Sequence, residues 1–152
     1  VGLVLLNTLS LMSSRRAADM DAEAASNIQA SDDDEDKNQA LRSIQNAYSQ
    51  LLVELSEAIE KGSGTTASNK LISDTDNIII KLSLPSNYSL GLKDALTSSI
   101  HDYIINKALM DWFTITNPNE AKVYSELAVV SLRNLHETFN RRERPSRTAP
   151  SA

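Results

Sequence analysis

The clearest hydrophobic pattern lies in the C-terminal half of the chain. From residue 89 to residue 113, apolar side chains recur every three or four positions and then spread to most sides of the expected helix: Leu92, Leu96, Ile100, Tyr103, Ile104, Ile105, Ala108, Leu109, Trp112 and Phe113. This spacing predicts a helix, for which Ser89 is the expected N-cap. Because a helix that is apolar on most sides has to be covered, we expect it to be central to a core or to lie beneath a partner.

A second helix is expected after a short loop at about residues 114–116. Asn117 is a good N-cap, Pro118 suits the first helical position, and Glu120 stands where a capping-box acid belongs. The predicted buried face of this helix is Tyr124, Leu127, Ala128, Val130, Leu135 and Phe139. Because the loop is short, the two helices should pack antiparallel.

An earlier helix is predicted over residues 31–61. Ser31 is its expected N-cap, and acids fill the first turn, where the helix dipole favours negative charge. Its apolar positions recur every three or four residues, at Leu41, Ile44, Tyr48, Leu51, Leu52, Leu55 and Ile59. Lys61 and Gly62 should end it, with a cation in the last turn and a permissive C-cap.

Two segments suggest β structure. Residues 77–84, NIIIKLSL, alternate in a period of two, are rich in β-branched residues and are followed by Pro85, which predicts a strand. Such a strand needs a partner, either the apolar segment at residues 3–6, a neighbouring subunit, or both. Residues 3–6 are themselves predicted as a short strand, followed by a helix over about residues 8–29.

These elements predict a mainly α fold with a small β element (α+β). The expected architecture is a four-helix bundle-like body with one or two short strands and an extended C-terminal tail. We expect a single helical domain over residues 1–140 and a basic tail over residues 141–152, in which Pro145 and Pro150 exclude regular structure.

Composition narrows the possible functions. The chain has 152 residues, enough for one domain with its own core, and it has no cysteine, which excludes disulfides and thiolate metal sites. Its net charge of -5 argues against a general nucleic-acid binder. The opening VGLVLLNTLSLM lacks the charged leader and clean cleavage site of a signal peptide and is too short to span a bilayer, so we expect a soluble protein with no membrane partner.

The charges are unevenly distributed along the chain. Residues 19–36 contain eight acids and no Lys or Arg, whereas the C-terminal end is rich in arginine. The candidate partner-contact residues are Asp32, Asp33, Asp34 and Asp36 in the acidic segment, and Arg141, Arg142, Arg144 and Arg147 in the tail. These two segments could meet on neighbouring copies, or they could be two solvated ends of the chain. The acidic run lacks the spacing of a calcium loop, so helix capping is its better interpretation.

Residues suited to catalysis are scarce. Neither His101 nor His136 has a second metal ligand at the helical spacing, and the chain contains neither a phosphate-binding glycine loop nor a G-x-S-x-G elbow. Trp112 and Tyr103 are predicted as core residues rather than base-stacking platforms. We therefore expect no enzyme activity, no cofactor and no metal site, and a function in contact with other proteins.

Several stretches resemble a known family. They are the strand with its LPSNY turn, the helix that ends in Trp112-Phe113, the N-P-N-E-A turn, the last helix and the R-P-containing end. SDDDEDK…AYSQLL and LLNTLSLM resemble earlier elements of the same family. The chain is thereby similar to small proteins of tailed phages and prophages of gut Bacteroidetes that look like head–tail connector (neck, adaptor or head-completion) proteins.

This resemblance implies a virion structural protein, assembled in the host cytoplasm and located at the head–tail junction. It implies a ring of about twelve copies around the DNA channel, between the portal protein and the tail or neck proteins. Contact with passing DNA would not be sequence-specific, and the family has no catalytic residues to transfer. One alternative is a tail-completion or tail-terminator protein of the same virion. Another is a small DNA-binding regulator, which the four tail arginines favour and the net charge opposes.

Overall fold

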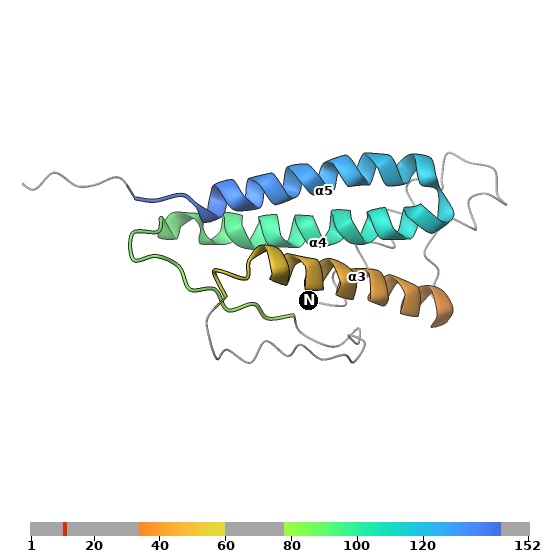
Figure 1. Cartoon of the computed structure of the whole chain (residues 1–152), viewed down its shortest axis with the longest axis horizontal. Helices are drawn as coiled ribbons and strands as arrows, with labels where there is room; N and C mark the ends of the chain where they lie inside the picture. The colour runs from red at the N-terminus through yellow and green to blue at the C-terminus, as the bar shows by residue number, and fades with distance from the viewer. Residues whose placement is uncertain (1–10, 12–33, 60–77, 144–152) are drawn as a thin grey trace, which may run out of the picture.

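A computed structural model describes residues 11, 34–59 and 78–143 of the chain. The described part is mainly helical, as predicted, and consists of α3 (Asp34–Glu54), α4 (Lys93–Thr116) and α5 (Pro118–Phe139), with a short 3₁₀ turn, η1 (Leu90–Leu92), before α4. Helix α4 lies between α3 and α5, and both neighbours run opposite to it (Figure 1). The strand expected at residues 3–6 and the helix expected at about residues 8–29 lie, apart from Leu11, outside the described residues.

Helix α4 is the central helix, as its apolar pattern predicted. Eight of its side chains are buried: Leu96, Tyr103, Ile104, Ile105, Ala108, Leu109, Trp112 and Phe113. Leu92 and Ile100 are partly buried against the same core. Because α3 and α5 pack on α4 from two sides, most of the circumference of this helix is covered.

The connection between α4 and α5 is tighter than expected. The predicted loop at residues 114–116 is helical, and Asn117 alone links the two helices. Its backbone N–H donates to the Phe113 carbonyl at 2.8 Å, and its side-chain oxygen accepts from the Asn119 N–H at 3.2 Å, so the predicted cap is confirmed. The Phe113 and Tyr124 rings stack across this turn with centroids 5.2 Å apart, which holds the antiparallel hairpin closed.

The start of α4 differs from the prediction. Ser89 makes no side-chain capping hydrogen bond to the helix, and α4 begins at Lys93. Instead, the Leu92 N–H donates to the Ser89 carbonyl at 2.9 Å, which closes the 3₁₀ turn. A backbone hydrogen bond in the 3₁₀ turn, rather than a side-chain cap, therefore precedes the start of α4.

Helix α3 ends earlier than predicted, at Glu54 rather than near residue 61. After Glu54, the backbone N–H groups of Ser56 and Ala58 donate to the carbonyls three residues before them. These turns are tighter than those of an α-helix, so the α conformation ends here. Its predicted buried face is largely confirmed, since Leu41, Ile44, Leu51 and Leu55 are buried and Tyr48 and Leu52 are partly buried. The expected caps Ser31, Lys61 and Gly62 lie outside the described residues.

The strand predicted at residues 77–84 does not form in its described part, residues 78–84. This segment is extended but pairs only through a single antiparallel bridge between Leu82 and Ile59, where the Ser83 N–H donates to the Ala58 carbonyl at 2.8 Å. The alternation is nevertheless real: Ile78, Ile80, Leu82 and Leu84 pack against the core, and Ile79, Lys81 and Ser83 are exposed. The alternation therefore reflects the two sides of an extended segment that has no neighbouring strand among the described residues.

The buried face of α5 is only partly the predicted one. Its buried residues are Tyr124, Ala128, Ser131 and Leu135, while Phe139 is partly buried. Leu127 and Val130, which were expected in the core, keep 42% and 52% of their surface exposed. Since α5 packs mainly on α4, only one stripe of α5 can be covered. Leu127 and Val130 project from a neighbouring side of the helix, so they stay exposed.

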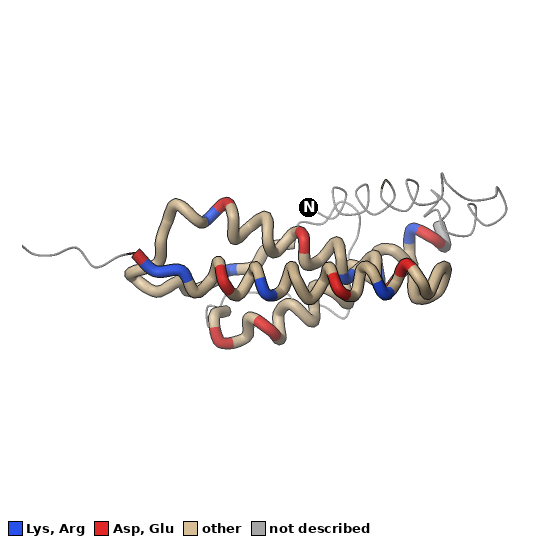
Figure 2. Tube along the Cα trace, turned by 90° about the horizontal axis from the view of Figure 1, so that it is seen from above, with Lys and Arg blue, Asp and Glu red and all other residues tan. Residues whose placement is uncertain are grey.

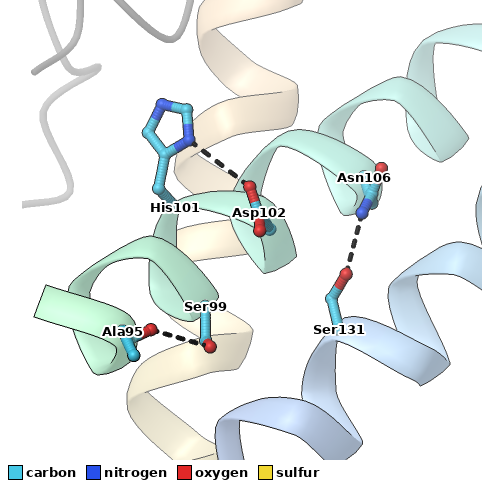
Figure 3. Close-up of polar contacts among 6 residues, drawn as sticks. All are labelled: Ala95, Ser99, His101, Asp102, Asn106 and Ser131. Carbon is cyan, nitrogen blue, oxygen red and sulfur yellow. Dashed lines mark hydrogen bonds and ion pairs between the residues drawn. The ribbon is translucent and has the colours of Figure 1, made fainter. Parts of the chain in front are cut away.

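One polar contact crosses the apolar α4–α5 interface. The Asn106 side-chain amide donates to the Ser131 hydroxyl at 2.8 Å, between the facing sides of the two helices (Figure 3). Ser131 is buried, so its hydroxyl would be costly to leave unpaired. The pair therefore favours one lengthwise register of α5 on α4.

We predict that Ser131→Ala lowers the free energy of unfolding by about 1 kcal/mol, because the partly buried Asn106 amide loses its acceptor. Urea unfolding followed by the fluorescence of Trp112, the single tryptophan and 4% exposed, would measure this change. Ser98→Ala, at an exposed position of α4, is the matched control. Equal stability of the two variants would show that the hydrogen bond contributes nothing.

Candidate protein-contact surfaces

The outward side of α5 presents a continuous apolar stripe. Val123, Leu127 and Val130 keep 42%, 42% and 52% of their surface exposed, and their spacing of four and three residues places them on one side of the helix. Asn134, also exposed, continues the same line. We call these four residues the α5 stripe. Exposed apolar residues that gather in one line on a helix are typical of a surface that packs against another helix.

Charged residues of both signs run beside the α5 stripe. Lys122, Glu126, Arg133 and Glu137 are all exposed, and acidic and basic positions alternate along α5, the helix that faces the viewer in Figure 2. Arg133 donates from Nε to Glu137 Oε1 at 3.1 Å. Neither Lys122 nor Glu126 makes an ion pair with another described residue. The surface beside the stripe therefore carries charges that remain open to a partner.

A second surface lies where α5 ends. An open pocket of about 450 Å³ is lined there by Leu92, Asn134, Glu137, Thr138 and Arg141. Leu90, in the adjacent 3₁₀ turn, is 72% exposed. We call the surface formed by Leu90, Leu92, Arg141 and Arg142 the basic end. It combines the exposed Leu90 and the partly buried Leu92 with two exposed arginines, next to the carboxylates of Glu137 and Glu143.

The chain leaves the basic end in a defined direction. Arg142 pairs with Tyr88 in an antiparallel bridge, and the Glu143 N–H donates to the Asn87 carbonyl at 2.8 Å. The Arg142 guanidinium also donates to the Phe139 carbonyl at 2.9 Å, which satisfies one of the free carbonyls at the end of α5. The tail therefore starts from a fixed point on the body.

The predicted contact residues fall at the two ends of the body. Arg141 and Arg142 are exposed at the C-terminal end of α5, while Asp34 opens α3 and Asp36 is half-buried in its first turn. Because α3 and α5 both run antiparallel to α4, the start of α3 and the end of α5 lie at opposite ends (Figure 1). These acidic and basic groups of one body thus cannot meet each other. Asp32, Asp33, Arg144 and Arg147 lie outside the described residues.

The two histidines make local contacts. His101 Nδ1 lies 3.9 Å from Asp102 Oδ1 on the surface of α4 (Figure 3), and His136 Nε2 lies 3.8 Å from Glu54 Oε2, which joins the ends of α5 and α3. Within the described ranges, no group of three or more His, Asp or Glu side chains could hold a metal ion. The two histidines thus contact carboxylates in the way surface residues commonly do.

Three described groups have a shifted pKa, and all lie among the helices. Burial raises the pKa of the Tyr103 phenol, and the carboxylates of Glu54 and Asp111 raise it further. Burial also raises the pKa of Asp111, against the opposing effect of Lys107, and burial raises the pKa of Tyr48. None of these groups lines the pocket at the basic end. Among the described residues, no acid or base with a shifted pKa therefore lines this open pocket.

Sequence reasoning missed the α5 stripe, because it assigned Leu127 and Val130 to the core. The available signal was the excess of apolar residues on α5: besides its buried stripe, the helix carries Val123, Leu127, Val129 and Val130 on other sides. A helix with more apolar surface than one neighbour can cover offers the remainder to a further partner.

None of the helices in the described ranges is both long enough and apolar enough to cross a bilayer. Comparison of the chain with protein-family models, curated proteins and solved structures found no match. The resemblance to head–tail connector proteins therefore stays a prediction from the sequence, and the surfaces above carry the functional argument.

We predict that Asp111→Asn raises the free energy of unfolding at pH 7. The folded-state pKa of Asp111 is raised, so burial disfavours its charged form. The cost of that charge grows as the pH rises from the unfolded carboxyl pKa of about 3.9 through the folded pKa, and it is absent below both. The gain in the variant should therefore shrink as the pH is lowered towards about 3.9.

Urea unfolding at a series of pH values would measure this dependence. Asp102→Asn is the matched control, because Asp102 lies on the same helix with its side chain exposed. A gain from Asp111→Asn that does not change with pH would contradict the assignment.

Proposed function

We propose that the protein is a structural component of a tailed-phage virion, a head–tail connector that forms a ring of about twelve copies between the portal and the tail. The observation that carries the proposal is the separation of charge along the body. The acidic start of α3 and the basic end lie at opposite ends. By sequence, the first turn of α3 is mainly acidic and the basic end carries Arg141 and Arg142, so the two ends of one copy differ in charge.

Such a pair of surfaces suits the contact that a ring requires. In a ring, one face of each copy meets a different face of the next copy, and the rotation between neighbours closes the circle. Opposite charges that cannot meet within a body can meet between neighbouring bodies, and they oppose the like-with-like orientations. The exposed Leu90, and Leu92, which lines the same pocket as Arg141, would add apolar contact area to this ionic attraction.

The tail is the second contact in this proposal. Its first residues are held by the bridge between Arg142 and Tyr88, so Arg144 and Arg147 follow directly after a fixed point. Arginine side chains form bidentate contacts with carboxylates, which suits docking onto an acidic surface of the portal or of a neighbour. The net charge of -5 suits a channel wall, because like charge keeps passing DNA from binding.

We predict that a chain ending at Glu143 loses attachment to portal rings by at least about tenfold in affinity, which corresponds to about 1.4 kcal/mol. This truncation keeps the hydrogen bond between Glu143 and Asn87 but removes Arg144 and Arg147. Co-sedimentation of the chain with purified rings of a tailed-phage portal protein would measure the affinity. Undiminished attachment would remove the tail from the contact.

Two full-length variants separate charge from chain length. Arg144→Ser with Arg147→Ser should weaken attachment as the truncation does, whereas Arg144→Lys with Arg147→Lys should largely keep it. Electron micrographs of the assembled complex test the ring itself. Twelve-fold symmetry supports the connector, six-fold symmetry favours a tail terminator, and the absence of rings contradicts both. Salt-sensitive binding of the free protein to DNA in a gel-shift assay would instead favour a regulator.

A further inference from the structure

We propose that two copies of this chain pair through the α5 stripe, with their α5 helices antiparallel about a two-fold axis close to Val129. The stripe is exposed in the single chain, with Val123, Leu127 and Val130 in one line. Burial of apolar side chains between two helices is favourable, and a spacing of four and three residues is the one that lets helices interlock lengthwise. The inference concerns the side of the body, whereas the proposed ring uses its two ends.

The charges beside the stripe select a second copy as the occupant. In an antiparallel pair with Leu127 opposite Val130 of the partner subunit, Val123 comes opposite Asn134 of the partner subunit. In this register Glu126 lies two residues along the helix, about 3 Å, from the level of Arg133 of the partner subunit, an offset that the two long side chains can span, and the two-fold axis repeats each of these contacts. An acid thus meets a base twice, beside an apolar seam.

The outer charges follow the same rule. Lys122 is likewise two residues, about 3 Å, from the level of Glu137 of the partner subunit. The order of these four exposed charges along α5 is base, acid, base, acid, at Lys122, Glu126, Arg133 and Glu137, so reversal of the four brings unlike charges near one another. A parallel pair in register would instead place Glu126 against itself. These four charges of one α5 are therefore complementary to those of a second α5 that runs in the opposite direction.

The length of the stripe sets the strength of the pairing. From Val123 to Asn134 it covers about 16 Å at the helical rise of about 1.5 Å per residue. A single helix pair of this length buries less surface than the roughly 1,600 Å² of a standard stable interface. The pairing should therefore be reversible and depend on protein concentration.

We predict that sedimentation velocity of the full chain shows a monomer–dimer equilibrium, and that Glu126→Arg weakens the dimer by at least about tenfold, because it places like charges across the seam. Arg133→Glu should weaken it as well, and the double variant E126R with R133E should restore pairing, since the charges are exchanged on both copies. Glu57→Arg and Lys93→Glu are exposed controls that change the net charge equally and should leave the dimer unchanged.

A cross-linking experiment tests the register without charge reversal. The natural chain has no cysteine, so a mixture of the E126C and R133C chains can form disulfides only at the introduced sites. The mixed disulfide should form in preference to either homodimer, because the register places residue 126 two residues from the level of residue 133 on the other copy, whereas two residues 126 are five residues apart and two residues 133 are nine residues apart. Preference for a homodimer would overturn the register.

The equilibrium measurements have equally clear contrary outcomes. A chain that stays monomeric at every concentration overturns the pairing and leaves the stripe to another partner. A dimer that Glu126→Arg does not weaken, or that the double variant does not restore, overturns it too. Because Arg133→Glu also removes the internal contact with Glu137, Glu126→Arg is the decisive single change. If the pairing fails, the proposed ring is not contradicted, because the ring is tested separately, by electron microscopy of the complex with portal.

Discussion

Helix α4 is apolar on most of its sides, and the arrangement of the described residues follows from the need to cover it. A soluble helix normally buries one stripe, but α4 buries residues as far apart around its axis as Tyr103, Ile104 and Ile105. One neighbour cannot cover three successive positions, because they point in directions about 100° apart. Helices α3 and α5 therefore pack on α4 from two sides, and the apolar side chains of residues 78–84 pack against the same core.

The same constraint explains why α5 offers a surface to a partner. The single-residue turn at Asn117 and the stacked rings of Phe113 and Tyr124 hold α5 against α4 with one stripe inward. The Asn106–Ser131 hydrogen bond favours the same register from within the interface. With its orientation held in this way, α5 leaves Val123, Leu127 and Val130 outside. The proposed side-by-side pairing is thus a consequence of how the core is built.

The polar groups among the described residues mainly make contacts between and along the packed helices. Tyr103 and Asp111 have raised pKa values because they are partly buried between helices, and the contact of His136 with Glu54 joins the ends of α5 and α3. The proposed contact surfaces instead lie on the outside, at the two ends and along α5. The connector role proposed above would require several such surfaces on one body, and the three packed helices offer them.

Local residue chemistry was sufficient to predict that α3, α4 and α5 are helices and that Asn117 caps α5, but not where α3 ends or how α4 begins. Capping by Asn117, the fixed φ of Pro118 and helical apolar spacing act within a few residues, so they are readable from the chain alone. The central position of α4 was equally readable, because its apolar surface exceeds what one neighbour can cover.

Two features depended on which segments come together in space. Residues 78–84 carry the alternation of a strand, but a strand exists only when another segment supplies a ladder of hydrogen bonds, and Ile59 supplies a single bridge. On α5, the sets Tyr124–Ala128–Leu135 and Val123–Leu127–Val130 both have helical spacing, so periodicity could not decide which set faces α4. Packing against α4 made that choice, since one helix covers only one stripe of its neighbour.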